Sequence, residues 1–242
     1  MPTASEIERV RERMDRANSV GILTGAGISA ESGVPTFRGG GGTAIWKGMR
    51  FDQISSAEMV RRDLPAVWEW FDYRRGVLQE CEPNPAHRAI ANWQDRFESL
   101  TLVTQNIDGL HRGAGSRDVI EVHGNIHRSR CVSCSKMFQM DRACVPHDPD
   151  TCVCGSPVRP DVVLFGEMLP EGAYEKGAEA AASCDVFFTI GTSALVYPAA
   201  MLPEIAKRSG AFLVEVNPEE TPLTSSCDLS LRGKAGELLP LL

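Results

Sequence analysis

Short hydrophobic runs, each followed by a polar or glycine-containing segment, recur along the chain. The runs at 20–24, 100–104, 186–190 and 212–216 are short and rich in β-branched and aliphatic residues, as buried parallel strands are. Helix-like stretches separate these runs, so the pattern predicts an α/β fold with a Rossmann-like parallel sheet. Because ligands bind beyond the carboxyl ends of such strands, we expect the polar segments to face one crevice.

Two stretches do not fit the sheet pattern. Residues 46–98 are helix-like, and residues 126–159 hold closely spaced cysteines with little continuous hydrophobic sequence. We therefore expect a smaller inserted subdomain with a helical part and a cysteine-containing part. The segments 1–45, 99–125 and 160–242 are expected to form the Rossmann-like domain.

Composition and charge narrow the classes of partner. The chain has 242 residues, of which 43% are hydrophobic, so it can bury a core without disulfides. A formal net charge of −7 disfavours nucleic acid as the main ligand, because phosphate binding needs a basic face. No apolar signal region and no run of about 18 apolar residues occurs, so we expect a cytoplasmic protein that binds no membrane.

Four of the eight cysteines form two close pairs, Cys131 with Cys134 and Cys152 with Cys154. In a chain without a secretory signal, such pairs indicate a metal site, and four thiolates suit one structural Zn²⁺. The second pair departs from the commoner CxxC spacing, so Cys144 stands as the alternative to Cys152. A closed four-thiolate site has no open coordination position, and we expect no chemistry from its zinc.

Gly25, Gly27 and Ala30 form a GxGxxA sequence directly after the first predicted strand. Glycines let the backbone approach a pyrophosphate, and a helix N-terminus favours its charge, so this loop indicates a dinucleotide. A tight turn without a ligand is the alternative. A dehydrogenase would also place an acidic residue after a second strand, but Asp52 has no clear strand before it.

The other polar segments offer hydrogen-bonding groups and a base. Residues 105–108 place two amides and a carboxylate at a strand end, where they can bind a carboxamide, although a self-satisfied turn is the alternative. Among the five histidines, His123 stands out because Gly124 after it leaves room for a substrate. It also precedes the cysteine-containing stretch, at the expected seam between subdomains, where clefts form. A histidine is the natural general base near neutral pH, so His123 is a candidate for that role, and an ordinary surface or core histidine is the alternative.

Together these segments resemble the sirtuin family, most closely its bacterial branch, over residues 19–240. The segments that carry the resemblance follow in that family's order: GAGISAESGVPTFRG at 25–39, TQNIDGLH at 104–111, EVHGN at 121–125, RPDVVLFGE at 159–167, GTS at 191–193 and EVN at 215–217. The resemblance implies an NAD-dependent protein-lysine deacylase that acts on acyl-lysine-bearing proteins or peptides. NAD would be consumed, with release of nicotinamide and O-acyl-ADP-ribose.

The resemblance also implies roles for individual residues. His123 would be the catalytic base that deprotonates a ribose hydroxyl, with Asn106 as the second catalytic residue, while His111 would help frame the site. The residues implied for NAD binding are Gly25, Ala26, Gly27, Glu31, Thr36, Phe37, Arg38, Gln105, Asn106, Ile107, Asp108, Gly191, Thr192, Ser193, Asn217 and Ala235. Those implied for the substrate are Phe71, Arg74, Val162, Val163, Phe165, Gly166 and Glu167. Without the resemblance, residues 161–165 would be interpreted as a core strand.

One position departs from the family pattern and bears on the acyl group. In the sirtuin branch that removes succinyl or malonyl groups, a Tyr and an Arg three residues later hold the acyl carboxylate. Arg74 aligns with that Arg, but Phe71 occupies the Tyr position. We therefore predict deacetylation with weaker desuccinylation, the alternative being that Arg74 is only a solvated helix charge.

Three other functions compete with deacylation. Mono-ADP-ribosyl transfer to protein would use the same NAD cleavage with a different acceptor. A zinc-knuckle binding protein with a vestigial NAD pocket is disfavoured because His123, Asn106, Asp108 and Arg38 are all present. A dehydrogenase is disfavoured by the missing ribose acid.

Overall fold

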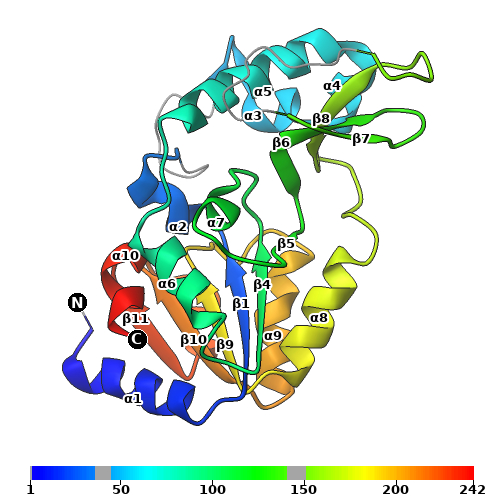
Figure 1. Ribbon diagram of the computed structural model, residues 1–242. Coiled ribbons are helices and arrows are strands. Elements are labelled where there is room, and N and C mark those ends of the chain that lie inside the picture. The colour runs from blue at the N-terminus through cyan, green and yellow to red at the C-terminus, as the bar shows by residue number, and fades with distance from the viewer. Residues whose placement is uncertain (1, 36–44, 141–150) are drawn as a thin grey trace.

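The computed structural model describes residues 2–35, 45–140 and 151–242 of the chain. Within these ranges, six strands form a parallel sheet in the order β11-β10-β9-β1-β4-β5 (Figure 1). Four of them coincide with the predicted hydrophobic runs, which confirms the Rossmann-like α/β fold. The strands are β1 (Ser19–Thr24), β4 (Ser99–Thr104), β5 (Ile120–Glu121), β9 (Val186–Ile190), β10 (Phe212–Asn217) and β11 (Leu229–Arg232).

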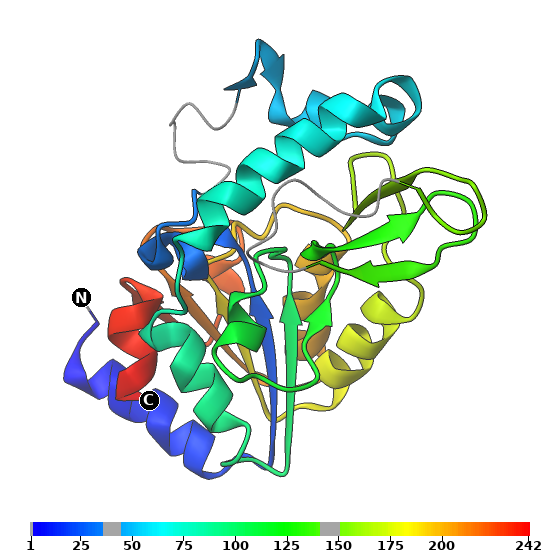
Figure 2. The ribbon, with the colours of Figure 1, turned by 45° about the horizontal axis from the view of Figure 1, so that its top comes forward.

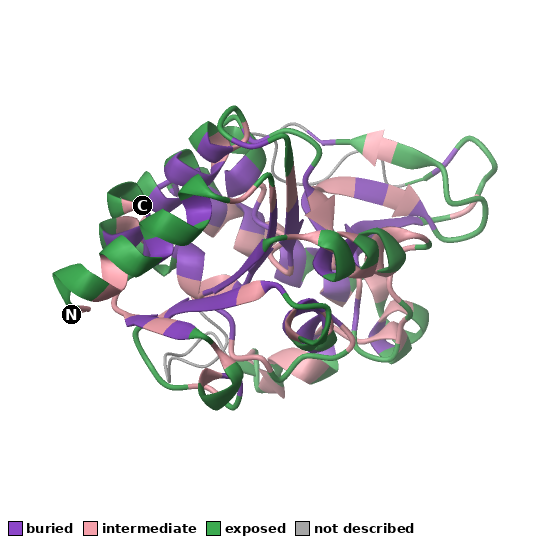
Figure 3. Cartoon of the chain, turned by 90° about the horizontal axis from the view of Figure 1, so that it is seen from below, coloured by how far each residue is buried: buried purple, intermediate pink, exposed green. Residues whose placement is uncertain are grey.

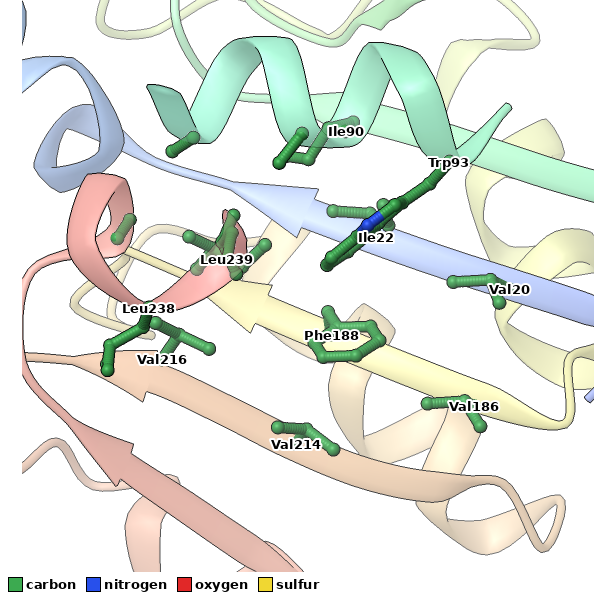
Figure 4. Packing of buried hydrophobic residues seen from close by; sticks show 14 of the residues in the cluster. Val20, Ile22, Ile90, Trp93, Val186, Phe188, Val214, Val216, Leu238 and Leu239 are labelled. Carbon is green, nitrogen blue, oxygen red and sulfur yellow. The ribbon is translucent and has the colours of Figure 1, made fainter. Parts of the chain in front are cut away.

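Helices cover both faces of this sheet. Successive side chains along each strand point to opposite faces, and both sets are hydrophobic, so both faces have to be buried. Ile22 and Phe188 point toward α1, α6 and α10, and Figure 4 shows them in one hydrophobic layer with Ile90 and Trp93. The residues next to Ile22 and Phe188 along the strands point to the other face of the sheet, where they share a hydrophobic cluster with α8 and α9. In Figure 3 the buried residues accordingly lie on the sheet and the inner sides of the helices. The helices of this domain are α1 (Ala4–Asp15), α2 (Ala26–Ser29), α6 (Pro85–Trp93), α7 (Leu110–Gly113), α8 (Ala173–Ser183), α9 (Leu202–Arg208) and α10 (Ala235–Leu238), with 3₁₀ turns at Ala30–Ser32, Ala199–Met201, Thr224–Ser226 and Leu239–Leu241.

A smaller subdomain lies beyond the carboxyl ends of the strands (Figures 1 and 2). It combines the helices α3, α4 and α5 with an antiparallel sheet in the order β7-β6-β8. The Trp68 indole N–H on α5 donates to the Val158 carbonyl on β8 at 2.8 Å, which joins the helical part to the cysteine-containing part. The elements are β2 (Ile45–Trp46), β3 (Met49–Arg50), α3 (Phe51–Ile54), α4 (Ala57–Arg62), α5 (Leu64–Gln79), β6 (Gly124–Cys131), β7 (Met137–Gln139) and β8 (Val158–Val162).

Helix α6 falls inside the stretch 46–98 that we expected to form the helical insert, yet it packs on the parallel sheet. Ala86, Ala89, Ile90 and Trp93 lie at helical spacing and join the same hydrophobic cluster as β1 and β9. The helices that pack with the small subdomain therefore end with α5. Among the described residues, no helix is both long enough and apolar enough to span a bilayer.

Candidate active site

A cavity of about 1430 Å³ lies where the strand ends of the parallel sheet meet the small subdomain. Its lining contains every described residue for which we predicted NAD or substrate contact. Thr36, Phe37 and Arg38, which were also predicted, lie outside the described residues. The predicted residues in the lining are Gly25, Ala26, Gly27, Glu31, Phe71, Arg74, Gln105, Asn106, Ile107, Asp108, His123, Val162, Val163, Phe165, Gly166, Glu167, Gly191, Thr192, Ser193, Asn217 and Ala235.

The glycine-rich loop after β1 lies in direct backbone contact with the loop after β9. The Gly27 N–H donates to the Gly191 carbonyl at 2.7 Å, and the Gly25 N–H donates to the Ile190 carbonyl at 3.0 Å. A Cβ atom at Gly27 would lie only 2.7 Å from the Gly191 Cα. These glycines are therefore needed for the contact between two loops, besides leaving backbone exposed to the cavity.

The amide and carboxylate of the segment after β4 are held by Ser29, a buried residue of α2. The Ser29 hydroxyl donates to Asp108 Oδ2 at 2.8 Å and accepts from the Asn106 amide at 3.1 Å. The Asp108 carboxylate also accepts from the Leu110 N–H at 2.9 Å, so the turn predicted as an alternative exists alongside the cavity contact. Burial raises the pKa of Asp108 above its ordinary value.

His123 is held with one ring nitrogen fixed. Its Nδ1 lies 2.9 Å from the Gln105 carbonyl oxygen, which can only accept, so Nδ1 carries the proton in the neutral ring. The other nitrogen, Nε2, is then the atom that can accept a proton. Burial lowers the pKa of His123 below its ordinary value, which keeps the ring neutral near pH 7.

The structure explains the glycine at position 124 differently from the sequence analysis. Its φ is +79°, and a Cβ atom there would lie 2.1 Å from the Asp161 carbonyl oxygen on β8. The glycine is therefore required by the close approach of β6 and β8, rather than by room for a substrate beside His123.

A layer of buried polar side chains lies behind the cavity, and sequence reasoning missed most of it. His87 Nε2 lies 3.4 Å from the Ser29 hydroxyl, and burial lowers the pKa of His87 to about 4. The His111 ring lies 4.8 Å from that of His87 and bonds Thr24 at 2.9 Å, so His111 supports the site from within the core. Two sequence signals could have identified this layer. One is Ser29 within GAGIS, and the other is the helix start at Asn84-Pro85, where the Asn84 side-chain amide donates to the Ile28 carbonyl.

Phe71 and Arg74 lie one turn apart on α5 and both line the cavity. The Phe71 residue is 2% exposed. The Arg74 guanidinium lies over the Trp70 ring, 5.5 Å from its centroid. Burial lowers the pKa of Arg74, and the charge of the Asp108 carboxylate acts in the opposite direction. Arg74 is therefore not merely a solvated helix charge.

The segment after β8 borders the mouth of the cavity. The core-strand interpretation of 161–165 holds only to Val162, where β8 ends, since Phe165 is 53% exposed. The Val163 N–H donates to the His123 carbonyl at 2.9 Å. The Glu167 carboxylate lines the cavity but is paired with Arg159 and accepts the Leu164 N–H at 2.9 Å.

At the other end of the cavity, the Asn217 amide donates to the Thr192 carbonyl at 2.8 Å, and Gln105 donates to the Thr192 hydroxyl at 2.9 Å. The predicted Glu31 accepts the Gly236 N–H at 2.8 Å, so it ties the loop after β1 to α10. The loops after β1, β4, β9 and β10 are thus joined to one another around this end, as the strand pattern predicted.

The cysteine pairs converge at the far end of the small subdomain. In the described part of the chain, the sulfur atoms of Cys131, Cys134, Cys152 and Cys154 all lie within 4.8 Å of one another. Cys131 and Cys154 are 3.5 Å apart, and Cys134 and Cys152 are 3.6 Å apart. Four zinc–sulfur bonds of about 2.3 Å at tetrahedral angles place sulfurs about 3.8 Å apart, so this donor set fits Zn²⁺. Cys152 thus lies with the other three predicted ligands; Cys144 lies outside the described residues.

Comparison with known proteins gives one consistent result. Residues 25–198 match the model of the Sir2 family. The chain is 48% identical to an NAD-dependent protein deacylase of Thermus thermophilus, with 98% of this chain and 93% of the relative covered. It is 46% identical to NAD-dependent protein deacylase 2 of Pyrobaculum aerophilum, over 91% of this chain and 88% of the relative.

Solved structures agree with these sequence relatives. A Sir2 homologue in complex with NAD superposes with a TM-score of 0.89 at 41% identity, covering 97% of this chain and 91% of the other. A Sir2 protein with a p53 peptide and NAD superposes with a TM-score of 0.82 at 31% identity, covering 97% and 95%.

Proposed function

The chain belongs to the Sir2 family, and from this premise we propose that it is an NAD-dependent protein-lysine deacylase that uses His123 as its base. The observation that carries this assignment is the convergence of the predicted NAD and substrate residues on one cavity, with His123 in its lining. The relatives that support it are named as deacylases, and one solved Sir2 protein holds both a peptide and NAD. Deacylation is therefore favoured over ADP-ribosyl transfer to protein.

The reaction assigns distinct tasks to the two ends of the cavity. Bound NAD supplies the ribose carbon from which nicotinamide leaves and the ribose hydroxyls that take up the acyl group. The loops after β1 and β9, with Asn217, would hold its adenosine and phosphates, where the exposed backbone of Gly25 and Gly27 accommodates a pyrophosphate. Asn106 and Asp108 would orient the nicotinamide carboxamide, since Ser29 fixes both side chains.

His123 is suited to the proton transfer. The Gln105 carbonyl fixes its Nδ1–H, and the neutral ring leaves Nε2 to remove a proton from a ribose hydroxyl. The segment 162–167 would pair with the peptide as an added strand and bring the acyl-lysine into the cavity. Nicotinamide would leave earlier, as the acyl oxygen bonds the ribose carbon; the deprotonated hydroxyl would then attack the acyl carbon, and one water would be consumed as free lysine and O-acyl-ADP-ribose are released.

We extend the proposal to partners and organisation. The partners are acyl-lysine-bearing proteins or peptides rather than nucleic acid or membranes, and the location is the cytoplasm. Cys131, Cys134, Cys152 and Cys154 hold one structural zinc, which stabilises the module at 126–159 and takes no part in the reaction.

Mass spectrometry of the products tests the function. The protein is incubated with NAD and matched acetyl- and succinyl-lysine peptides, and we expect free lysine, nicotinamide and O-acyl-ADP-ribose. His123→Ala should lower turnover at least about 100-fold, because a positioned general base contributes that much. Its circular dichroism and melting temperature should match the wild type. ADP-ribosylated protein as the main product, or full turnover by His123→Ala, would contradict the proposal.

The acyl preference depends on the pair at 71 and 74. Arg74 offers a half-buried positive charge to an acyl carboxylate, but Phe71 supplies no hydroxyl beside it. We expect Phe71→Tyr to raise the ratio of desuccinylation to deacetylation about tenfold or more, because a hydrogen bond to a charged group is worth about 1.5–3 kcal/mol. Phe71→Met, similar in size but without a hydroxyl, is the control and should not raise the ratio. Equal ratios in all three proteins would remove this assignment.

A further inference from the structure

A continuous series of ion pairs runs alongside the catalytic histidine. In the described part of the chain it contains seven charged side chains of alternating sign, in spatial order Arg112, Glu121, Arg128, Asp161, Arg130, Glu167 and Arg159. We call this set the ion-pair series. It begins with Arg112 on α7 and Glu121 on the edge strand β5, and it ends with Glu167 and Arg159, beside the segment 162–167 that lines the cavity.

The first half of the series holds the segment that carries His123. The Glu121 carboxylate accepts from Arg112 at 3.2 Å, from the Asn125 amide at 2.7 Å and from Arg128 at 2.6 Å. Its side chain is 6% exposed and that of Arg128 is 21% exposed, so solvent and salt screen the Glu121–Arg128 pair less than the pair with the more exposed Arg112. Because Glu121 and Arg128 lie on either side of His123 in sequence, this pair closes the segment into a fixed loop.

The second half joins that segment to the cavity mouth. Arg128 donates to Asp161 on β8 at 2.9 Å, and Arg130 lies 3.8 Å from Asp161 and 3.6 Å from Glu167. Glu167 in turn is paired with Arg159. Arginines on β6 are thus paired with carboxylates on β8 and on the loop after it. The strands β6 and β8 run antiparallel.

The two tied segments have complementary tasks in deacylation. One carries the base, and the other carries the residues proposed to pair with the substrate peptide. Farther along, β6 and β8 pair on the main chain at Ser129 with Pro160, Arg130 with Arg159 and Cys131 with Val158, but the register shifts between Gly124 and Ser129. Next to His123, the described main-chain contacts are the Val163 N–H to the His123 carbonyl and the register pair of Gly124 with Val162. At the irregular part of this register, the Arg128–Asp161 ion pair joins the two strands through their side chains.

We propose that the ion-pair series sets the position of the His123 ring relative to the bound acyl-lysine, so that Glu121, Arg128 and Asp161 are positioning residues of the reaction. This inference rests on the proposed deacylase function. It assigns these residues no contact with NAD or with the reacting atoms. Their effect is on geometry, to which reaction rates are sensitive: a displacement of about 1 Å can lower the rate about 100-fold.

Neutralising the central carboxylate tests the proposal. Asp161→Asn removes the negative charge shared by Arg128 and Arg130 while keeping the side-chain shape. We expect kcat/KM for an acetyl-lysine peptide to fall at least about tenfold, with KM for NAD changed less than about twofold. Asp228→Asn, which breaks the Lys207–Asp228 pair at the opposite end of the sheet, is the control. It should leave both kinetic constants near those of the wild type, whatever it costs in melting temperature.

A double-mutant cycle separates a coupled series from independent pairs. No contact joins Glu121 to Arg130 in the described structure, so Glu121→Gln and Arg130→Met should be additive if each acts alone. We expect the double variant to lose clearly less in kcat/KM than the product of the two single losses. The proposal would be overturned if the losses of the two single variants were additive in free energy. It would also be overturned if Asp161→Asn changed KM for NAD and KM for the peptide in parallel.

Amide hydrogen exchange at Val163 provides a readout that needs no turnover. Asp161→Asn should speed this exchange in the folded protein, because the Val163 N–H bonds the His123 carbonyl across the two segments. Unchanged exchange would overturn the positioning role. An inactive wild-type protein with faster exchange in the variant would instead refute the deacylase function, and with it the role toward acyl-lysine, while showing that the series holds the two segments together.

Discussion

At the scale of single residues, the buried histidines behind the cavity make stability depend on pH. The His87 side chain is fully buried, and its pKa falls from 6.5 to about 4 because burial disfavours the charged ring. His111 is shifted in the same direction for the same reason. Both rings therefore stay neutral in the folded protein while the unfolded protein takes up protons below pH 6.5.

The sign of the effect follows from that difference. The stabilising contribution of His87 is fully present above pH 6.5 and is lost as pH falls from 6.5 toward 4. Each such histidine lowers the free energy of unfolding by about 1.4 kcal/mol per pH unit in that window. Urea unfolding at pH 7.5, 6.0 and 5.0 measures this slope, and His87→Gln should have a shallower one. Identical slopes in the two proteins would show that His87 does not titrate as described.

The predictability of the site differs among its residues. Gly27, Asn106, Asp108 and His123 could be predicted because they stand at strand ends, where the parallel fold brings segments together. His87 could not be linked to the site from the sequence, because its connection runs through Ser29 and exists only once α2 packs against α6. A residue that acts through a neighbour from another element leaves no local pattern.

At the scale of elements, the contact between the loops after β1 and β9 tolerates no side chain. Gly27→Ala would place a methyl group 2.7 Å from the Gly191 Cα, and relief requires movement of backbone in both loops. We expect a loss of about 1–3 kcal/mol in the free energy of unfolding and a clear rise in KM for NAD. Denaturant unfolding and initial-rate kinetics measure the two effects.

Helix α5 offers the matched control. A Cβ atom at Gly76 would meet nothing within 4 Å, and the residue lies within a regular helix. Gly76→Ala should therefore stabilise the protein by about 0.5–1 kcal/mol without changing KM for NAD. If both alanine variants behaved alike, the loop contact would not be the cause of the Gly27→Ala effect.

The zinc module allows a test between two cysteines. Cys152 lies with the other three ligands, with its Sγ 3.6 Å from that of Cys134. We expect Cys152→Ser to lose most of its bound zinc and to melt at a lower temperature, because closed zinc sites stabilise small modules directly. Cys144→Ser should keep one zinc per chain. Elemental analysis of both purified variants decides, and zinc loss from Cys144→Ser alone would reverse the assignment.

The elements themselves were predictable to different degrees. The hydrophobic runs of β1, β4, β9 and β10 were evident because parallel strands are buried on both faces. The core strand expected at 161–165 overlaps β8 (Val158–Val162) at two residues only, because the residues after Val162 have similar hydrophobicity but leave the sheet to border the cavity. The packing of α6 was not evident, because its helical pattern does not say which surface its hydrophobic side meets.

At the scale of the whole molecule, the cavity lies between the two subdomains, so a ligand there stabilises both. NAD binds the folded protein and not the unfolded chain, which adds about 2.7 kcal/mol at a concentration of 100 times Kd. For a chain of this length that corresponds to a rise in melting temperature of about 5–10 °C. Thermal scans with and without NAD measure it, with Asn217→Ala expected to show a smaller rise. A protein that melts at the same temperature in both conditions would not bind NAD as described.

The arrangement of the two subdomains was predictable only in outline. The sequence pattern indicated an insert with a helical part and a cysteine part, and the strand ends indicated where a ligand would bind. The ion-pair series was not evident, because its members are scattered from Arg112 to Glu167 and each is an ordinary surface charge by type.

The order of strands in the parallel sheet has a consequence for how the protein is made. Strand β1 is synthesised first but lies between β4 and β9, so both of its hydrogen-bonding edges need partners from later in the chain. Val20 pairs with Val186, which follows it by 166 positions. At the usual speed of a ribosome, that interval is on the order of 10 to 30 s. During translation β1 is thus open to chaperones and to other nascent chains, and slower elongation before residue 186 prolongs that exposure.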